Sequence, residues 1–285
     1  MANLKEIRKR IDSVKTTQKT TSAMKMVSAA KLRRAQDNYE QATPYSNKLK
    51  RVVSLLSSNF SAEDHPLFAQ REKARVAVIL ITSDRGLCGG FNSNLCKALM
   101  AELDQNKIDH AQFTTLGRKG QEFFKRTNHK ILENYTGIPV TEHRDTVQKV
   151  VQEHINKFEH NEIDRVYLAY ANFISVLTQE PTIETLLPIE PSSSEEESLD
   201  DREILFEPPA EQILDTLLKK YAENRVAVAW LNSIAGEHGA RMTAMDSATK
   251  NASELIEKLQ LYYNRSRQAA ITGELIEIIS GAESL

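Results

Sequence analysis

The segment best suited to chemistry is a glycine-rich turn at residues 83–92, which reads Ser-Asp-Arg-Gly-Leu-Cys-Gly-Gly-Phe-Asn and follows an unbroken apolar run at 76–81. A glycine-rich turn between a strand and a helix can hold phosphate groups on its backbone N–H groups. The glycine spacing matches neither G-x-G-x-x-G nor G-x-x-x-x-G-K-S/T, the two common nucleotide-binding patterns. The sequence therefore favours a structural tight turn, and a phosphate-binding loop is the alternative.

The sequence gives little support for a catalytic nucleophile or a metal site. Cys88 precedes a predicted helix, a position where a thiol can become a nucleophile, but the sequence marks no base to partner it. The seven histidines are scattered, and the chain contains neither H-E-x-x-H nor C-x-x-C. We therefore expect no catalytic residue, no metal site and no cofactor-binding residue.

Alternating strands and helices surround the turn. The apolar run at 76–81 has no polar side, which is typical of a strand covered on both faces. Further strands are predicted at 113–117, 165–173 and 182–188, and helices at 92–104, 118–126 and 145–160. This order predicts a small doubly wound, Rossmann-like α/β domain with mostly parallel strands.

Long helical segments flank this domain. Asn3 and Glu6 form an N-terminal capping pattern that opens a helix at Leu4, and Pro44 is expected to kink or break that helix. Prolines at 208–209 suit the first turn of a second helix that runs to the C-terminus. We expect the two helices to form an antiparallel coiled coil. The predicted domains are an N-terminal coiled-coil helix at 1–58, the inserted α/β domain at 75–205 and a C-terminal coiled-coil helix at 208–285.

The C-terminal helix carries a heptad pattern, which is typical of a helix wound around a partner. The stretch 275–279, Leu-Ile-Glu-Ile-Ile, follows this seam and is interpreted as apolar almost all round, so we expect it to insert into another protein. The predicted seam comprises Ala252, Leu255, Leu259, Tyr262, Ser266, Ala269, Gly273 and Ile276.

Charge is divided unevenly along the chain, although the whole chain has a formal net charge of -2. Residues 1–58 hold 13 Lys and Arg against 4 Asp and Glu, whereas residues 59–207 hold 16 against 25. A basic N-terminal arm favours an acidic partner, which could be a nucleic acid, a membrane surface or an acidic protein. No run is long and apolar enough for a membrane span.

Four segments together resemble one family, the gamma subunit of the F-type ATP synthase. They are 24–33, Met-Lys-Met-Val-Ser-Ala-Ala-Lys-Leu-Arg; the turn at 83–92; 237–252; and 271–282, Ile-Thr-Gly-Glu-Leu-Ile-Glu-Ile-Ile-Ser-Gly-Ala. Gly273 departs from the family, where a glutamine is usual. The likeness extends over essentially the whole chain.

The resemblance implies a central rotor that couples rotation of a membrane c ring to ATP synthesis or hydrolysis in a surrounding hexamer. The implied partners are the alpha and beta subunits, the epsilon subunit and the c-subunit ring, and the catalytic residues would lie on beta. The chain would be peripheral, held at the cytoplasmic face of the bacterial inner membrane only through the complex, with no nucleic-acid partner. Implied contacts with the hexamer are Met24, Arg267, Gln268, Thr272, Ile276 and Ile279, and implied contacts with the c ring are Phe206 and Glu207.

Two other classes of function stay open on the sequence. One is a nucleotide-dependent enzyme with helical arms, for which tight binding of ATP or NAD to the isolated chain would be diagnostic. The other is a coiled-coil adaptor that binds nucleic acid through its basic arm, with an affinity that falls steeply with salt. Neither explains the apolar C-terminal stretch.

Overall fold

The computed structural model describes residues 4–57, 65–71, 75–127, 129–189 and 209–283. These residues fall into two compact units, one formed by Met1–Ala29 with Arg241–Leu285 and the other by Ala30–Ala240. Each unit therefore takes part of both long helices, whereas the predicted domains divide the chain at the helix ends. The elements are α1 (Leu4–Ser57), η1 (Pro66–Phe68), β1 (Val76–Ile81), α2 (Phe91–Gln105), β2 (Ala111–Leu116), α3 (Arg118–Phe124), β3 (Lys130–Tyr135), η2 (Val140–Glu142), α4 (His143–Glu159), β4 (Arg165–Phe173), β5 (Gln179–Leu187) and α5 (Ala210–Glu283).

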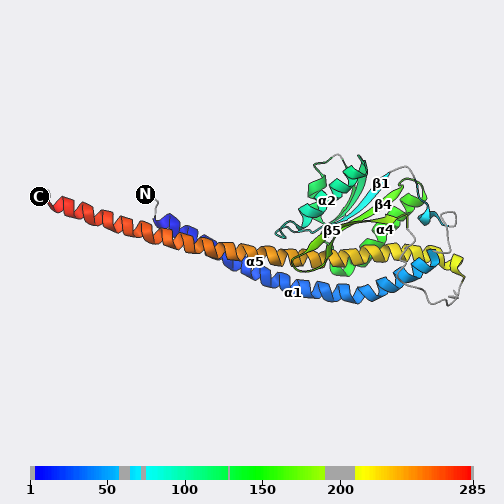
Figure 1. Cartoon of the computed structure of the whole chain (residues 1–285), viewed down its shortest axis with the longest axis horizontal. Helices are drawn as coiled ribbons and strands as arrows, with labels where there is room; N and C mark the ends of the chain where they lie inside the picture. The colour runs from blue at the N-terminus through cyan, green and yellow to red at the C-terminus, as the bar shows by residue number, and fades with distance from the viewer. Residues whose placement is uncertain (1–3, 58–64, 72–74, 128, 190–208, 284–285) are drawn as a thin grey trace. The chain divides into compact units, whose positions relative to one another are not determined.

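A five-stranded sheet forms the centre of the second unit, in the order β3-β2-β1-β4-β5 (Figure 1). All neighbouring strands are parallel except β4 and β5, which are antiparallel. The predicted doubly wound domain with mostly parallel strands is confirmed. Strand β3 is absent from the prediction, because it is a half-buried edge strand whose second half contains the polar residues Glu133 and Asn134.

Both faces of the sheet are covered by helices, which explains the unbroken apolar sequence of β1. Ala77, Ile79 and Ile81 point to one face, and the alternate residues of β1 point to the other. The first face packs against α4 and the parts of α1 and α5 in this unit, through residues such as Leu49, Val150, Phe158, Leu218 and Val226. The second face packs against α2 and α3, through Leu95, Leu99, Leu103 and Phe124.

Helix α1 continues through Pro44 without a break. The sequence predicted a kink or a break at Pro44, and the break is wrong. An interior proline removes one backbone donor and crowds the carbonyl four residues earlier, so packing must hold the helix together there. Buried residues on both sides of it, including Ala35 before and Leu49 and Val53 after, hold the helix against the rest of the second unit.

In the first unit, α1 and α5 pair as an antiparallel coiled coil. Three side-chain contacts show the antiparallel direction, because the residue numbers rise along α1 as they fall along α5: Gln18 to Ser253, Thr21 to Thr249 and Lys25 to Asp246. The predicted pairing of the terminal helices is confirmed. Apolar residues buried in this unit are Ile7 and Ile11 of α1 and Met245, Ala252 and Ile256 of α5.

The predicted seam on α5 is only partly correct. Ala252 is buried, but Leu255 and Tyr262 are exposed, and Ile256 takes the buried position next to Ala252. A helix with 3.6 residues per turn drifts away from a strict seven-residue repeat, so a neighbouring residue can turn into the interface.

Candidate functional site

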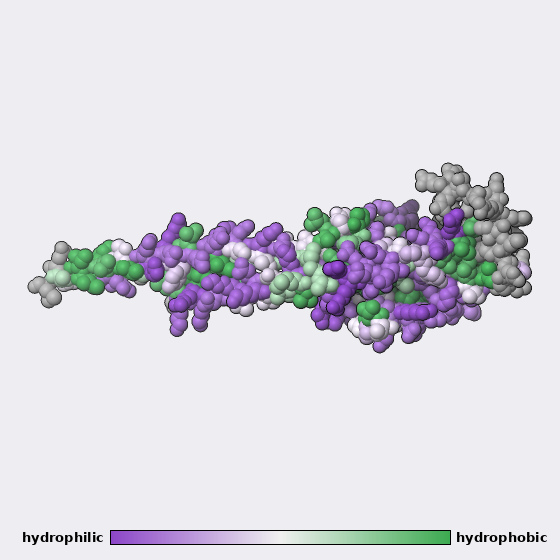
Figure 2. All heavy atoms as spheres, turned by 90° about the horizontal axis from the view of Figure 1, so that it is seen from below, coloured by the Kyte–Doolittle hydropathy of each residue, from purple (hydrophilic) through white to green (hydrophobic). Residues whose placement is uncertain are grey.

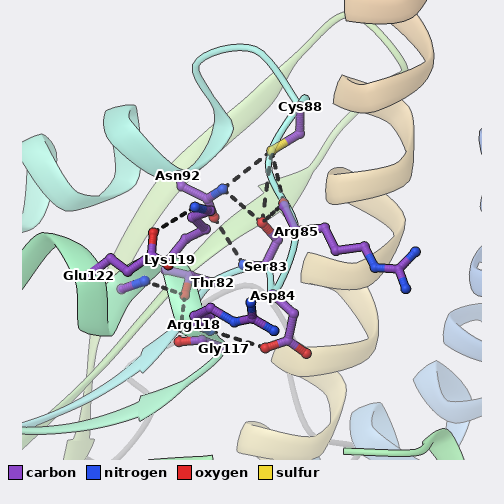
Figure 3. Close-up of polar contacts among 11 residues, drawn as sticks. Thr82, Ser83, Asp84, Arg85, Cys88, Asn92, Gly117, Arg118, Lys119 and Glu122 are labelled. Carbon is purple, nitrogen blue, oxygen red and sulfur yellow. Dashed lines mark hydrogen bonds and ion pairs between the residues drawn. The ribbon is translucent and has the colours of Figure 1, made fainter. Parts of the chain in front are cut away.

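The glycine-rich turn lies at the carboxyl end of β1, where an open α/β sheet commonly binds ligands (Figure 3). Its polar groups are used within the protein. The backbone N–H of Ser83 donates to Oδ1 of Asn92 at 2.9 Å, and Nδ2 of Asn92 donates to Oγ of Ser83 at 2.7 Å. The hydroxyl of Ser83 in turn donates to the carbonyl oxygen of Arg85. These bonds close the turn on itself.

The carboxylate of Asp84 occupies a position that an anionic ligand would need. Its two oxygens accept hydrogen bonds from the backbone N–H groups of Arg118 at 3.1 Å and Gly137 at 2.8 Å. Arg118 is the first residue of α3, so the aspartate supplies the negative charge that a helix N-terminus attracts. The geometry favours the structural turn over the phosphate-binding alternative.

Gly117, just before α3, allows this close packing. Its φ is +114°, and a Cβ there would lie 2.1 Å from the carbonyl oxygen of Thr82. The Thr82 hydroxyl oxygen accepts a hydrogen bond from the backbone N–H of Gly120. The end of β1 and the start of α3 thus meet backbone to backbone, which leaves no room between them for a bound group.

The cysteines lie in packed surroundings. Cys88 is buried and its Sγ lies 3.3 Å from Nδ2 of Asn92 and 3.8 Å from Oγ of Ser83. Burial raises the pKa of Cys96 to about 12, which keeps that thiol protonated and unreactive. These environments are those of small core residues.

His154 shows how the scattered histidines are used in the core. Its Nδ1 lies 2.8 Å from the carbonyl oxygen of Val150 and its Nε2 lies 3.3 Å from Oγ1 of Thr114. Burial lowers its pKa, so the ring is neutral and bridges α4 to β2. Over the described residues, no three His, Cys, Asp or Glu side chains are placed to hold a metal ion.

The C-terminal end of α5 is the clearest exposed apolar surface. Figure 2 shows green residues gathered at this end of the helix. At about 100° per residue, the side chains cover roughly 160° of the helix, and Glu274 and Glu277 lie on the other side. The stretch thus has one broad apolar face and an acidic back, which corrects the expectation that it is apolar almost all round. The exposed fractions are Ile271 50%, Leu275 53%, Ile276 58%, Ile278 67% and Ile279 58%.

The three polar residues singled out on α5 lie on or beside this apolar face. Arg267, Gln268 and Thr272 are all exposed. By helical spacing, Gln268 and Thr272 continue the apolar face towards the N-terminus of α5, whereas Arg267 lies just outside the edge of that face. On α1, Met24 is half-buried in the first unit. Phe206 and Glu207 lie outside the described residues.

The polar contacts of the coiled coil were not predicted. Gln18 Nε2 donates to Ser253 Oγ at 2.7 Å, and Lys25 Nζ lies 2.6 Å from Asp246 Oδ1. The hydrogen bond from Lys25, with a second cation at Lys250, lowers the pKa of Asp246. The signal available in the sequence was the polar run at 16–22 inside an otherwise apolar helix seam.

Comparison with known proteins gives the family. A family model described as ATP synthase matches residues 3–285. A relative named ATP synthase gamma chain, from Geotalea uraniireducens (strain Rf4), is 50% identical over 287 residues, covering 100% of this chain and 99% of the relative. This chain belongs to the ATP synthase gamma chain family. Another gamma chain, from Pelotomaculum thermopropionicum (strain DSM 13744 / JCM 10971 / SI), is 45% identical with 100% of both chains covered.

Solved structures agree on the fold of the gamma chain family. A rotor chain of the Euglena gracilis mitochondrial ATP synthase has a TM-score of 0.65 at 18% identity, covering 94% of this chain and 98% of that one. A chain of the Tetrahymena thermophila mitochondrial ATP synthase central stalk and c ring has a TM-score of 0.60 at 22% identity, covering 80% and 99%. The family resemblance drawn from the sequence motifs is confirmed.

Proposed function

We propose that this chain is the central-stalk rotor subunit of a proton-translocating F-type ATP synthase, and that it couples rotation of the c ring to conformational changes at catalytic sites on the beta subunits. Membership of the gamma chain family supports this role. The observation that carries it is the broad exposed apolar face at the C-terminal end of α5, with exposed fractions of 50–67%. Monomeric proteins seldom leave such a face uncovered, because each large apolar side chain is worth about 1.5–3 kcal/mol when buried.

The apolar face is proposed to turn within a sleeve formed by the alpha and beta subunits. Ile276 and Ile279 belong to this face and need no directional bond, so they can contact successive neighbours as the rotor turns. Glu274 and Glu277 on the back of the helix stay hydrated. The interaction supplies affinity and alignment and includes no catalytic group.

A second contact with the hexamer is proposed at Arg267, Gln268 and Thr272, which form a polar catch against one beta subunit. All three are exposed, which leaves their donors available. Gln268 and Thr272 lie on the apolar side of α5, and Arg267 lies at its edge. Charged and polar groups of this kind fix rotational position more than they add affinity. Met24 on α1 is a further proposed contact with the hexamer.

The segment just before α5 is proposed to take part in binding the epsilon subunit and the c ring. Phe206 and Glu207, just before the long C-terminal helix, are the proposed c-ring contacts, with Glu207 paired to a basic group of a c-subunit loop. Cysteine substitution at Glu207 should give a crosslink to a cysteine in that loop and stop proton-coupled ATP synthesis. A crosslink only to alpha or beta would contradict this assignment.

The chain is proposed to be a non-catalytic subunit that reaches the cytoplasmic face of a bacterial inner membrane through its partners. The turn after β1 supports a non-catalytic role, because its polar groups form hydrogen bonds with one another. Among the described helices, none is long and apolar enough to cross a membrane.

Co-assembly tests the proposal directly. The chain, expressed with the alpha and beta subunits of a bacterial ATP synthase, should co-purify as one complex with ATPase activity. Ile276→Asp should reduce the yield of that complex while the isolated chain keeps its helix content, because Ile276 is exposed in the chain alone. A wild-type chain that fails to join alpha and beta, or an Ile276→Asp chain that joins them equally well, would contradict the proposed bearing.

A further inference from the structure

The start of α4 meets α5 through a stacked ring pair that the proposed function does not use. The imidazole of His143 and the indole of Trp230 have centroids 4.0 Å apart and planes inclined by 10°. Both residues belong to the second unit. Trp230 is buried and is the only tryptophan of the chain. The stack therefore joins the first residue of α4 to the first third of the long C-terminal helix.

The two ring nitrogens of His143 have different surroundings. Nε2 of His143 lies 3.2 Å from the carbonyl oxygen of Ile138, so the ring proton is on Nε2 and donates to that oxygen. The other nitrogen, Nδ1, is buried and has no hydrogen-bond partner within the described chain. An unpaired nitrogen at a buried position is unfavourable in either form, and the cost is larger when the nitrogen carries the proton of a charged imidazolium.

Few charges act on this ring. Asp84 is the carboxylate whose field reaches it, and that side chain is fixed by backbone donors of Arg118 and Gly137. The α5 residues one turn on either side of Trp230 are Val226, Ala227, Ser233 and Ile234, which are uncharged. Glu142, Arg144 and Asp145, beside His143 in sequence, are exposed to solvent.

Burial lowers the pKa of His143 below its ordinary value, and this effect exceeds the opposite influence of the Ile138 carbonyl and of Asp84. A histidine with a lowered pKa binds its proton more weakly in the folded chain than in the unfolded chain. Its contribution to stability is present above the ordinary histidine pKa of about 6.5 and is lost as the pH falls through the folded value.

We propose that the His143–Trp230 stack is a protonation-controlled contact, in which a solvent proton taken up by Nδ1 of His143 separates the two rings and loosens the start of α4 from α5. The separated imidazolium reaches water, where both nitrogens find acceptors. The rest of the second unit, held by its apolar core, stays folded. The inference stands on the stack and on the unpaired nitrogen, and it does not depend on the rotor function.

Trp230 makes the test direct, because the stack on His143 is the only aromatic contact of this tryptophan among the described residues. In the full-length chain, titration from pH 8 to pH 5 should shift the emission to longer wavelength, with a midpoint below pH 6.5. His143→Phe keeps a ring against Trp230 but cannot titrate, so its emission should stay constant. His143→Gln removes the ring and should give the red-shifted emission at every pH. His160→Gln, at an exposed histidine after the same helix, should titrate like the unchanged chain.

Three results of these titrations would contradict the proposal. A His143→Phe chain that keeps the acid transition would assign the transition to another group, such as buried His154, and would overturn the proposal. Constant Trp230 emission in the unchanged chain would overturn it as well. A midpoint above pH 6.5 would mean that the indole stabilises the imidazolium, and it would reverse the direction that we infer. The far-ultraviolet circular dichroism, recorded in parallel, should stay constant over the same range.

Discussion

Two isoleucines on α5, Ile256 and Ile276, separate the surface that stabilises the chain from the surface that binds partners. Ile256 is 8% exposed and Ile276 is 58% exposed. The same substitution, Ile to Ala, therefore removes a packed side chain at one position and a hydrated one at the other. A core Ile→Ala change costs about 2–5 kcal/mol. A coiled coil of two helices is thin, so we expect the lower end at Ile256, about 2 kcal/mol.

Ile276→Ala should leave the unfolding free energy of the isolated chain within about 0.5 kcal/mol of the unchanged chain. The affinity of the chain for its partner subunits should change more. Covering the remaining 58% of Ile276 would contribute roughly 0.9–1.7 kcal/mol to binding, which corresponds to a loss of about four- to twenty-fold in affinity on truncation.

Urea unfolding measures the first effect. With a slope of about 2 kcal/mol per molar, a loss of about 2 kcal/mol lowers the midpoint by about 1 M. Circular dichroism at 222 nm follows helix loss, while Trp230 fluorescence follows the second unit separately and should not change its midpoint. Equal midpoints for Ile256→Ala and the unchanged chain would refute the assignment of Ile256 to the coiled-coil interface. A lowered midpoint for Ile276→Ala would show that its exposed face packs within the chain.

Three further changes test other parts of the structure. Gly117→Ala should lower the unfolding free energy, measured by urea unfolding, by more than about 3 kcal/mol. Gly117 has a φ of +114°, and a Cβ there would lie 2.1 Å from a backbone oxygen, so a methyl group has no room. A loss below about 1 kcal/mol would contradict this reasoning. Hydrogen bonds from Arg75 lower the pKa of Asp164, so the pair stabilises the fold above about pH 3.9 and does so less as the pH falls below that value. In Asp164→Asn, the unfolding free energy should therefore fall less steeply as the pH is lowered. An unchanged fall would exclude this contribution. Arg267→Ala with Gln268→Ala should lower the ATPase turnover of the assembled complex, and wild-type turnover would eliminate the proposed catch.

The amino-acid sequence by itself determined the elements with strong local patterns. The α/β domain was predictable from the apolar run of β1 and from the alternation of strands and helices. The paired terminal helices were predictable from the helix-starting signals and the long helical segments. Each of these patterns depends on residues close together in the chain. The apolar C-terminal stretch was equally visible, since 271–279 contains five large aliphatic residues. The motifs in the sequence also showed the resemblance to the gamma subunit family.

Tertiary structure alone decided which residues meet. Ile256 rather than Leu255 is buried, because the phase of a helix relative to its partner accumulates over many turns. Strand β3 has too few apolar residues to stand out, and its place comes from hydrogen bonds to β2. The donors to Asp84 are 34 and 53 residues away in sequence. Such contacts depend on chain segments brought together by folding, and no local pattern of residues specifies them.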